Sequence, residues 1–182
     1  MAPPRPRIVL LAALFLLSAC GDESQRRGAT VLFASGADLL SINPLLTDHP
    51  LARQVQRYVL LLTLARYDSA LTPRPYLARS WQWSGDRHAL TFHLRTDVRW
   101  HDGVPTTARD VAWTLNAARD PATGYPRMSQ LRGLTVVTAL NDSTVVLQFA
   151  SALAGFPDVL TDLAIVPAHL LDSIPHTRLR TA

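Results

Sequence analysis

Apolar and polar side chains alternate in two pairs of segments, and this period of two predicts β-strands. In residues 89–95, Leu90, Phe92 and Leu94 alternate with polar neighbours, so one face of the strand is buried and the other is wet. We predict a first hairpin that joins residues 80–83 to 89–95 through a Ser-Gly-Asp turn, and a second that joins 134–140 to 144–149 around Asn-Asp-Ser. Further candidate strands lie at 30–35, 98–101 and 163–166.

A spacing of three to four residues between apolar positions predicts a helix in residues 51–66. Val55, Val59 and Leu62 fall on one side of this helix. The prolines at positions 73 and 75 prevent the helix from continuing, because proline lacks the N–H that a helix interior needs. We therefore expect a buried apolar stripe on this segment.

A second helix is expected to begin after Thr107. Asp110 follows three residues later, and this pair is typical of a capping box, in which each side chain bonds the other residue's backbone N–H. The helix is expected to run to about Arg119 and to stop before Pro121. Short helices around the 163–166 strand complete an α+β chain with paired hairpins and packing helices.

The first residues have the pattern of an export signal. Arg5 and Arg7 precede an uninterrupted apolar run at 8–17, which is half the length of about 20 residues that a membrane-spanning helix needs. Small residues at 18–19 suit a signal peptidase. We therefore predict a signal peptide at residues 1–19 and an exported protein.

The lone cysteine of the chain lies directly after this signal. Leu-Ser-Ala-Cys at 17–20 is similar to a bacterial lipobox, in which the cysteine is acylated, and acylation gives Cys20 a role that a disulfide cannot. The alternative is a chance cysteine after a plain secretory signal. With lipidation at Cys20, the polar residues 20–29 form a tether, and residues 30–182 form the folded body.

The composition of the chain indicates a folded domain and argues against one class of binding partner. The apolar fraction of 48% and the four tryptophans indicate a folded domain rather than a disordered chain. The formal charge is +4, but the basic residues, all arginine, form no stripe interleaved with aromatic side chains. Nucleic acid is therefore not an expected partner.

Motifs for catalysis and for metal binding do not occur in the sequence. It has no Gly-x-Ser-x-Gly, no His-Glu-x-x-His and no Gly-rich phosphate loop, and its six histidines have no metal-ligand spacing. His93 and His101 could meet across a sheet, but an exposed strand histidine and a turn histidine are the favoured interpretation. We expect no enzyme activity, no catalytic residues, no metal site and no cofactor.

One block of the sequence is specific to a family. The block comprises Leu-Ala-Arg-Ser-Trp at 77–81, Leu-Thr-Phe-His-Leu-Arg at 90–95, Val-Arg-Trp-His-Asp-Gly at 98–103, Pro-Thr-Thr-Ala at 105–108 and Asp-Val at 110–111. It resembles the signature region of family 5 solute-binding proteins of ABC transporters, the dipeptide-, oligopeptide- and nickel-binding family. Ser-Ile-Asn-Pro at 41–44, Asp-Pro-Ala-Thr at 120–123 and Pro-Ala-His-Leu-Leu at 167–171 resemble further family blocks in the same order.

The resemblance implies the N-terminal part of a two-lobed fold like that of type II periplasmic binding proteins. Family members continue through a second lobe that this sequence lacks, so residues 30–182 are expected to be an incomplete lobe I, comprising its first strand and an extra subdomain. Asn43 stands where the family usually has Asp, and Arg109 stands where it tends to be acidic. Tryptophans 81, 83, 100 and 113 are expected to pack in the core rather than to contact a ligand.

The resemblance also implies candidate ligand contacts. In peptide-binding relatives the loop after the Ser-Leu-Asp-Pro motif lines the cleft, and here that loop contains Thr47, Asp48 and His49. Asp48 could receive a cationic ligand group, or it could lie in a solvated loop that starts the next helix. A further family contact follows the Asp-Pro-x-Thr block, where Arg127 could pair with a ligand carboxylate or be a plain surface arginine.

These implications define a function and its alternatives. The chain is expected to be a substrate-binding lipoprotein of an ABC importer that captures short peptides, or a similar small solute, on the periplasmic or extracellular side of the envelope. Its partners would be the ligand, the permease and ATPase subunits, and the membrane through the lipid anchor. The alternatives are a lipid-anchored interaction module without a transport role, and a non-functional truncated fragment.

Overall fold

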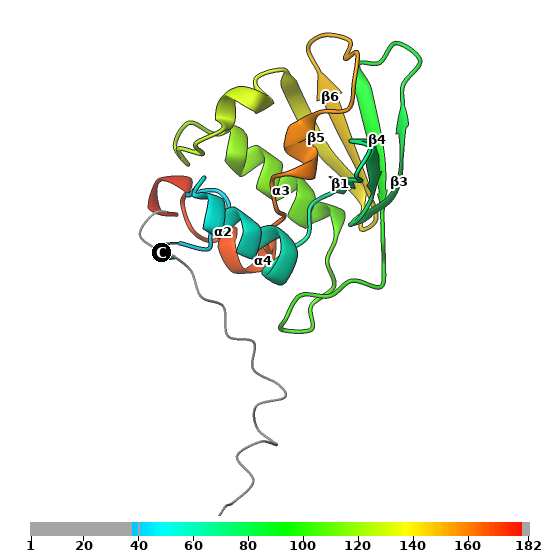
Figure 1. The fold of residues 1–182 in the computed structure, drawn as a ribbon. Coiled ribbons are helices and arrows are strands. Elements are labelled where there is room, and N and C mark those ends of the chain that lie inside the picture. Colours follow the sequence, from blue (N-terminus) through cyan, green and yellow to red (C-terminus); the bar gives the residue numbers. More distant parts are fainter. Residues whose placement is uncertain (1–37, 40, 180–182) are drawn as a thin grey trace, which may run out of the picture. The chain divides into compact units, whose positions relative to one another are not determined.

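The structure, a computed structural model, describes residues 38–39 and 41–179 (Figure 1). The signal peptide, Cys20, the tether and the candidate strand at 30–35 lie outside the described residues. In the part that is described, no helix is both long and apolar enough to cross a membrane.

A four-stranded antiparallel sheet forms from the two predicted hairpins. The strands are β3 (Ala78–Trp83), β4 (Ala89–Leu94), β5 (Leu134–Asn141) and β6 (Thr144–Phe149), in the order β3-β4-β6-β5. Phe92 of β4 pairs with Trp81 of β3 on one side and with Val145 of β6 on the other. Both hairpin predictions are therefore confirmed, and β4 lies inside the sheet.

The buried face of the sheet follows from the alternation in β4. Leu90, Phe92 and Leu94 are fully buried, and they belong to the same core as residues of α3 (Ala108–Arg119), which packs against β5 and β6 (Figure 1). Trp81 lies at the edge of this core, with its ring 6.0 Å from that of Phe92. All four tryptophans are only partly buried and pack against the core.

The predicted capping box starts α3. The backbone N–H of Thr107 donates to Asp110 Oδ2 at 2.8 Å, and the box is complete. Asp110 is nearly fully buried, and Asp110 Oδ1 also accepts the backbone N–H of Ala168 at 2.8 Å. One carboxylate therefore caps α3 and anchors the start of α4 (Ala168–Leu171).

The predicted helix at 51–66 is wrong in its second half and in its buried face. The segment forms α2 (Pro50–Val55) and the π-helix η3 (Gln56–Leu60), and then β1 (Ala65–Tyr67), which pairs with β2 (Pro73–Pro75). Val59, expected on the buried side, is 72% exposed, whereas Ala52 and Gln56 point inward.

Hydrogen bonds from distant segments explain the early end of this helix. The carbonyl of Leu62 accepts the N–H of Ile165 at 2.8 Å, and the carbonyl of Leu64 accepts the N–H of Ala78 at 3.0 Å. Backbone groups held in this way are not available to a helix, so tertiary pairing overrides the local helical pattern.

The C-terminal part contains short helical turns but no strand at 163–166, so that prediction was wrong. The turns are η4 (Met128–Leu131), η5 (Asp158–Thr161), α4 and η6 (His176–Arg178). Among residues 163–166, Val166 donates its N–H to Thr114 Oγ1 at 3.1 Å instead of to a neighbouring strand. Arg109, which departs from the family pattern, forms an ion pair with Asp172 of this segment.

The 98–101 segment lies in a loop and forms a single bridge, between Arg99 and Pro105. Asp102 accepts the N–H of Val104 at 3.0 Å, and Gly103 turns the chain with a φ of +86°. A positive φ of this size is strained for residues other than glycine, so the Asp-Gly sequence suits a turn at this position.

Two histidine–aspartate pairs, one exposed and one partly buried, allow a prediction of how stability depends on pH. His169 Nε2 lies 2.7 Å from Asp102 Oδ2, and His176 Nδ1 lies 2.6 Å from Asp120 Oδ2. These hydrogen bonds lower the pKa of Asp102 and Asp120 below the usual carboxyl value. A carboxyl pKa that is lower in the folded chain stabilises the fold above the unfolded pKa, and this contribution is lost as the pH falls.

We therefore expect the melting temperature to decrease as the pH falls below about 4. Circular dichroism melts between about pH 6 and pH 2 measure this, and the D102N/D120N double variant should show a shallower decrease. An equally steep decrease in the double variant would show that these two pairs do not carry the effect.

Candidate functional site

The structure brings three of the four predicted ligand-contact residues to one small hollow. Thr47, Asp48 and Arg127 line it, whereas His49 is exposed and lies outside its lining. The hollow measures about 10 Å³, which is room for about one water molecule. Its other lining residues are Pro44, Arg53, Gln56, Tyr125, Asp162 and Leu163, of which the last two come from a distant part of the chain.

Local turn chemistry positions the Thr47–Asp48 loop. Asn43 Oδ1 accepts the backbone N–H of Leu45 at 3.0 Å, and Leu45 is fully buried in the core. An aspartate at position 43 has the same acceptor oxygen, so the departure from the family pattern preserves the turn. Thr47 Oγ1 then accepts the N–H of His49 at 3.2 Å, and His49 occupies the N-cap of α2.

A second turn delivers Arg127 to the same place. Asp120 Oδ1 accepts the N–H of Ala122 at 2.8 Å, and Gly124 has a φ of +68°. Tyr125 follows and is buried beside the hollow, where burial raises the pKa of its hydroxyl. Arg127 then precedes η4, and 19% of its side chain is exposed.

Asp162 is the centre of the site, and sequence reasoning missed it. Its side chain is only 8% exposed, and its carboxylate contacts the guanidinium groups of Arg53, Arg57 and Arg127. Oδ2 faces Arg53 and Arg127, and Oδ1 faces Arg57. Arg53 also lies 3.5 Å from Asp48 Oδ1. The spacing of four residues between Arg53 and Arg57, which puts them on one helix face, was the available signal.

Gln56 adds a polar group that is buried behind the arginines. It is 2% exposed and lines the hollow, and within the described residues its Nε2 has no hydrogen-bond partner. A buried amide without a partner is costly, so a ligand or a water molecule in the hollow would stabilise it.

The charges of this cluster favour an anion. Three guanidinium groups face two carboxylates, those of Asp48 and Asp162, which leaves one positive charge in excess. Over the described residues, no group of three His, Cys, Asp or Glu side chains could hold a metal ion. The site therefore has the chemistry of a charged binding site.

The family model of the bacterial extracellular solute-binding proteins, family 5 Middle, matches residues 72–180, more than half of the chain. The periplasmic oligopeptide-binding protein OppA of Haemophilus influenzae is 36% identical over 118 residues, which are 65% of this chain and 21% of OppA. The chain thus spans about a fifth of the length of the curated relatives that it matches.

Solved structures share the fold. NikZ of Campylobacter jejuni in complex with Ni(L-His) matches with a TM-score of 0.68 and 27% identity, over 78% of this chain and 28% of NikZ. Haemophilus influenzae OppA in complex with RPPGFSPFR matches with a TM-score of 0.69 and 27% identity, over 79% of this chain and 32% of OppA. The expected α+β fold is confirmed, and the matched proteins are binding proteins rather than enzymes. The chain therefore belongs to the bacterial extracellular solute-binding proteins, family 5.

Proposed function

We propose that the chain is the substrate-binding component of an ABC importer and captures a short peptide, or a similar small solute, outside the cytoplasmic membrane. The observation that carries the proposal is the convergence of Thr47, Asp48 and Arg127 on one charged hollow. OppA is an oligopeptide-binding protein and NikZ was solved with Ni(L-His), so a peptide and a metal chelate are the two ligand classes to compare.

Capture would follow the two-lobe mechanism of such binding proteins. Two lobes close around the ligand by a hinge, and the closed form is what the permease recognises. A ligand shifts this equilibrium only by its extra affinity for the closed form. Asp48 and Arg127 would supply charges of opposite sign to a ligand that carries both an amino and a carboxylate group.

The proposal includes an anchor and partners. Acylation of Cys20 would hold the protein at the membrane, residues 20–29 would tether it, and residues 30–182 would contribute the first strand and the extra subdomain of an incomplete lobe I. The permease and ATPase subunits of the importer would be its partners. This arrangement puts the charged hollow on the periplasmic or extracellular side of the envelope.

Deletion of the gene in its own bacterium tests this function. We expect uptake of labelled trialanine to decrease at least tenfold and to return with the wild-type gene. The R127Q variant should restore it only partly, because a charge-assisted hydrogen bond is lost. R95Q is the matched control, since Arg95 pairs with Asp97 on an exposed surface. A Cys20→Ser variant should move the protein from the membrane fraction to the soluble fraction.

Unchanged uptake of both trialanine and nickel–histidine in the deletion strain would rule out the importer role for these solutes. An envelope defect in that strain would then favour the lipid-anchored interaction module. A Cys20→Ser protein that stays in the membrane fraction would contradict the anchor.

A further inference from the structure

A second hollow lies against the arginines that hold Asp162. It measures about 250 Å³, and its lining residues all come from the 50–58 segment of α2 and η3: Pro50, Arg53, Gln54, Arg57 and Tyr58. Arg53 lines both this hollow and the small one that contains Thr47 and Arg127. The two hollows therefore meet at Arg53, and we call the larger one the helix hollow.

We propose that the helix hollow binds a carboxylate group of the solute through Arg53 and Arg57. The inference rests on the proposed function and goes beyond it by naming the ligand group and two residues that hold it. An anionic end of the solute would lie in the helix hollow, next to the part of the site that Thr47, Asp48 and Arg127 line.

The donor capacity of the two arginines supports this assignment. A guanidinium carries five N–H donors in a planar fork, so the contacts of Arg53 with Asp162 and Asp48, and that of Arg57 with Asp162, do not exhaust either side chain. Arg53 and Arg57 are 33% and 23% exposed, and they reach solvent as well as the buried carboxylate. Asp162 therefore acts as a positioning residue, because its two oxygens hold the two guanidinium groups next to each other.

Tyr58 gives the helix hollow an aromatic side. Tyr58 is 71% exposed, and the guanidinium carbon of Arg57 lies 5.3 Å from the centre of its ring. Stacking on the ring orients the Arg57 fork, and an exposed aromatic ring offers an apolar contact to the rest of a solute. Together with the positive charge in excess, this combination favours an organic carboxylate over a bare inorganic anion.

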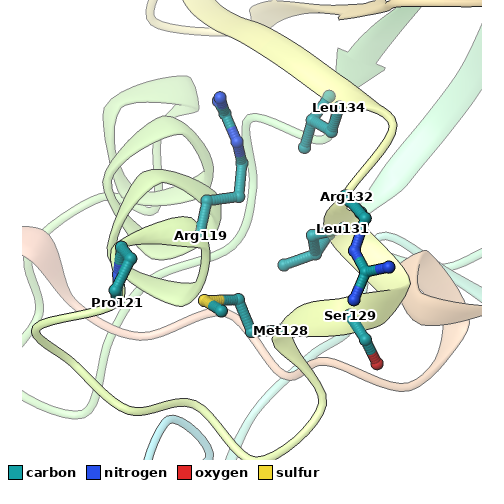
Figure 2. Close-up of a pocket in the computed structure, with 7 residues that line it drawn as sticks. All are labelled: Arg119, Pro121, Met128, Ser129, Leu131, Arg132 and Leu134. Atoms are coloured by element: carbon teal, nitrogen blue, oxygen red, sulfur yellow. The ribbon is translucent and has the colours of Figure 1, made fainter.

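Another hollow of similar size is a weaker candidate. Figure 2 shows Arg119 and Arg132 on opposite sides of a hollow of about 220 Å³, with Met128 and Leu131 between them. Arg119 donates to the carbonyl of Thr135 at 2.7 Å and to Asn116 Oδ1 at 3.3 Å. These bonds turn its guanidinium toward protein oxygens, and no acidic residue lines this hollow to pair its two arginines as Asp162 pairs Arg53 and Arg57.

The test is an NMR titration of the isotope-labelled 182-residue chain with N-acetyl-trialanine and, separately, with its C-terminal amide. The two probes differ by one carboxylate charge. We expect the acid to shift the Nε–Hε signals of Arg53 and Arg57 in a saturable way and to bind about tenfold tighter than the amide. Arg57→Gln should weaken binding of the acid by about tenfold, and Arg57→Lys, which keeps the charge but loses the fork, should weaken it less.

Arg74→Gln is the matched control, because Arg74 pairs with Asp68 away from the helix hollow and its loss should leave binding unchanged. Equal binding of acid and amide would overturn the inference, as would shifts confined to Arg119 and Arg132. If the Arg57 variants do not fold, the difference in affinity of the wild-type chain for the acid and for the amide tests the inference by itself. Failure of this titration leaves the importer role standing, whereas unchanged uptake in the deletion strain removes that role without affecting the titration.

Discussion

Replacing Phe92 with alanine is expected to lower the free energy of unfolding by about 4 kcal/mol. Phe92 is fully buried in β4, a strand that has a neighbour on each side. Its ring lies 6.0 Å from that of Trp81 and 6.1 Å from that of Phe156, so truncation removes aromatic contacts and leaves a cavity. Urea unfolding followed by tryptophan fluorescence measures the change.

The matched control is Thr91→Ala in the same strand. Thr91 is only partly buried and lies on the other face of the sheet, so its loss should cost less than about 1 kcal/mol. If Phe92→Ala cost no more than Thr91→Ala, the side chain would not be enclosed as described. The comparison separates loss of core volume from a general weakening of the strand.

Asp110→Ala is expected to destabilise the fold by about 3 kcal/mol. The nearly buried carboxylate accepts the backbone N–H groups of Thr107 and Ala168, each at 2.8 Å, and the indole N–H of Trp100 at 3.3 Å. Its loss removes the Asp110 half of the capping box of α3 and leaves buried donors without an acceptor. Urea unfolding gives the total, and amide hydrogen exchange at Ala168 should accelerate more than that at Leu90.

Asp97→Ala is the control for this substitution, because Asp97 is an exposed carboxylate that pairs with Arg95. Its removal should change the stability far less than Asp110→Ala does, because solvent screens an exposed ion pair. Equal effects of the two substitutions would show that the hydrogen bonds of Asp110 contribute no more than those of a surface ion pair.

The elements that sequence predicted well are those whose pattern is local. Alternation in residues 89–95 defines which face of β4 is buried, and the capping box at Thr107 defines where α3 begins. The failures involve distant partners. Leu62 and Leu64 have a helical pattern, but their carbonyl groups bond Ile165 and Ala78, and no local rule contains that information.

Some residues of the candidate site could be predicted from the sequence, and others could be found only from the fold. Thr47, Asp48 and Arg127 follow from the family resemblance, and the structure places them in one hollow, whereas His49 occupies the N-cap position of α2 outside it. Asp162 lies in a segment for which the sequence predicted only short helices. No sequence pattern indicated that it would contact Arg53, Arg57 and Arg127. Gln56 is polar within a helical pattern, and only the fold shows that it points inward.

The bonds that end the 50–60 helical segment also bear on how the chain reaches its native state. The backbone carbonyls of residues 62–64 accept hydrogen bonds from the N–H groups of Ile165, Leu77 and Ala78. Contacts of such wide sequence separation require the ends of a long loop to meet before they stabilise anything. The segment that carries Arg53 and Arg57 is therefore joined to a region of high contact order, the property that slows folding across small domains.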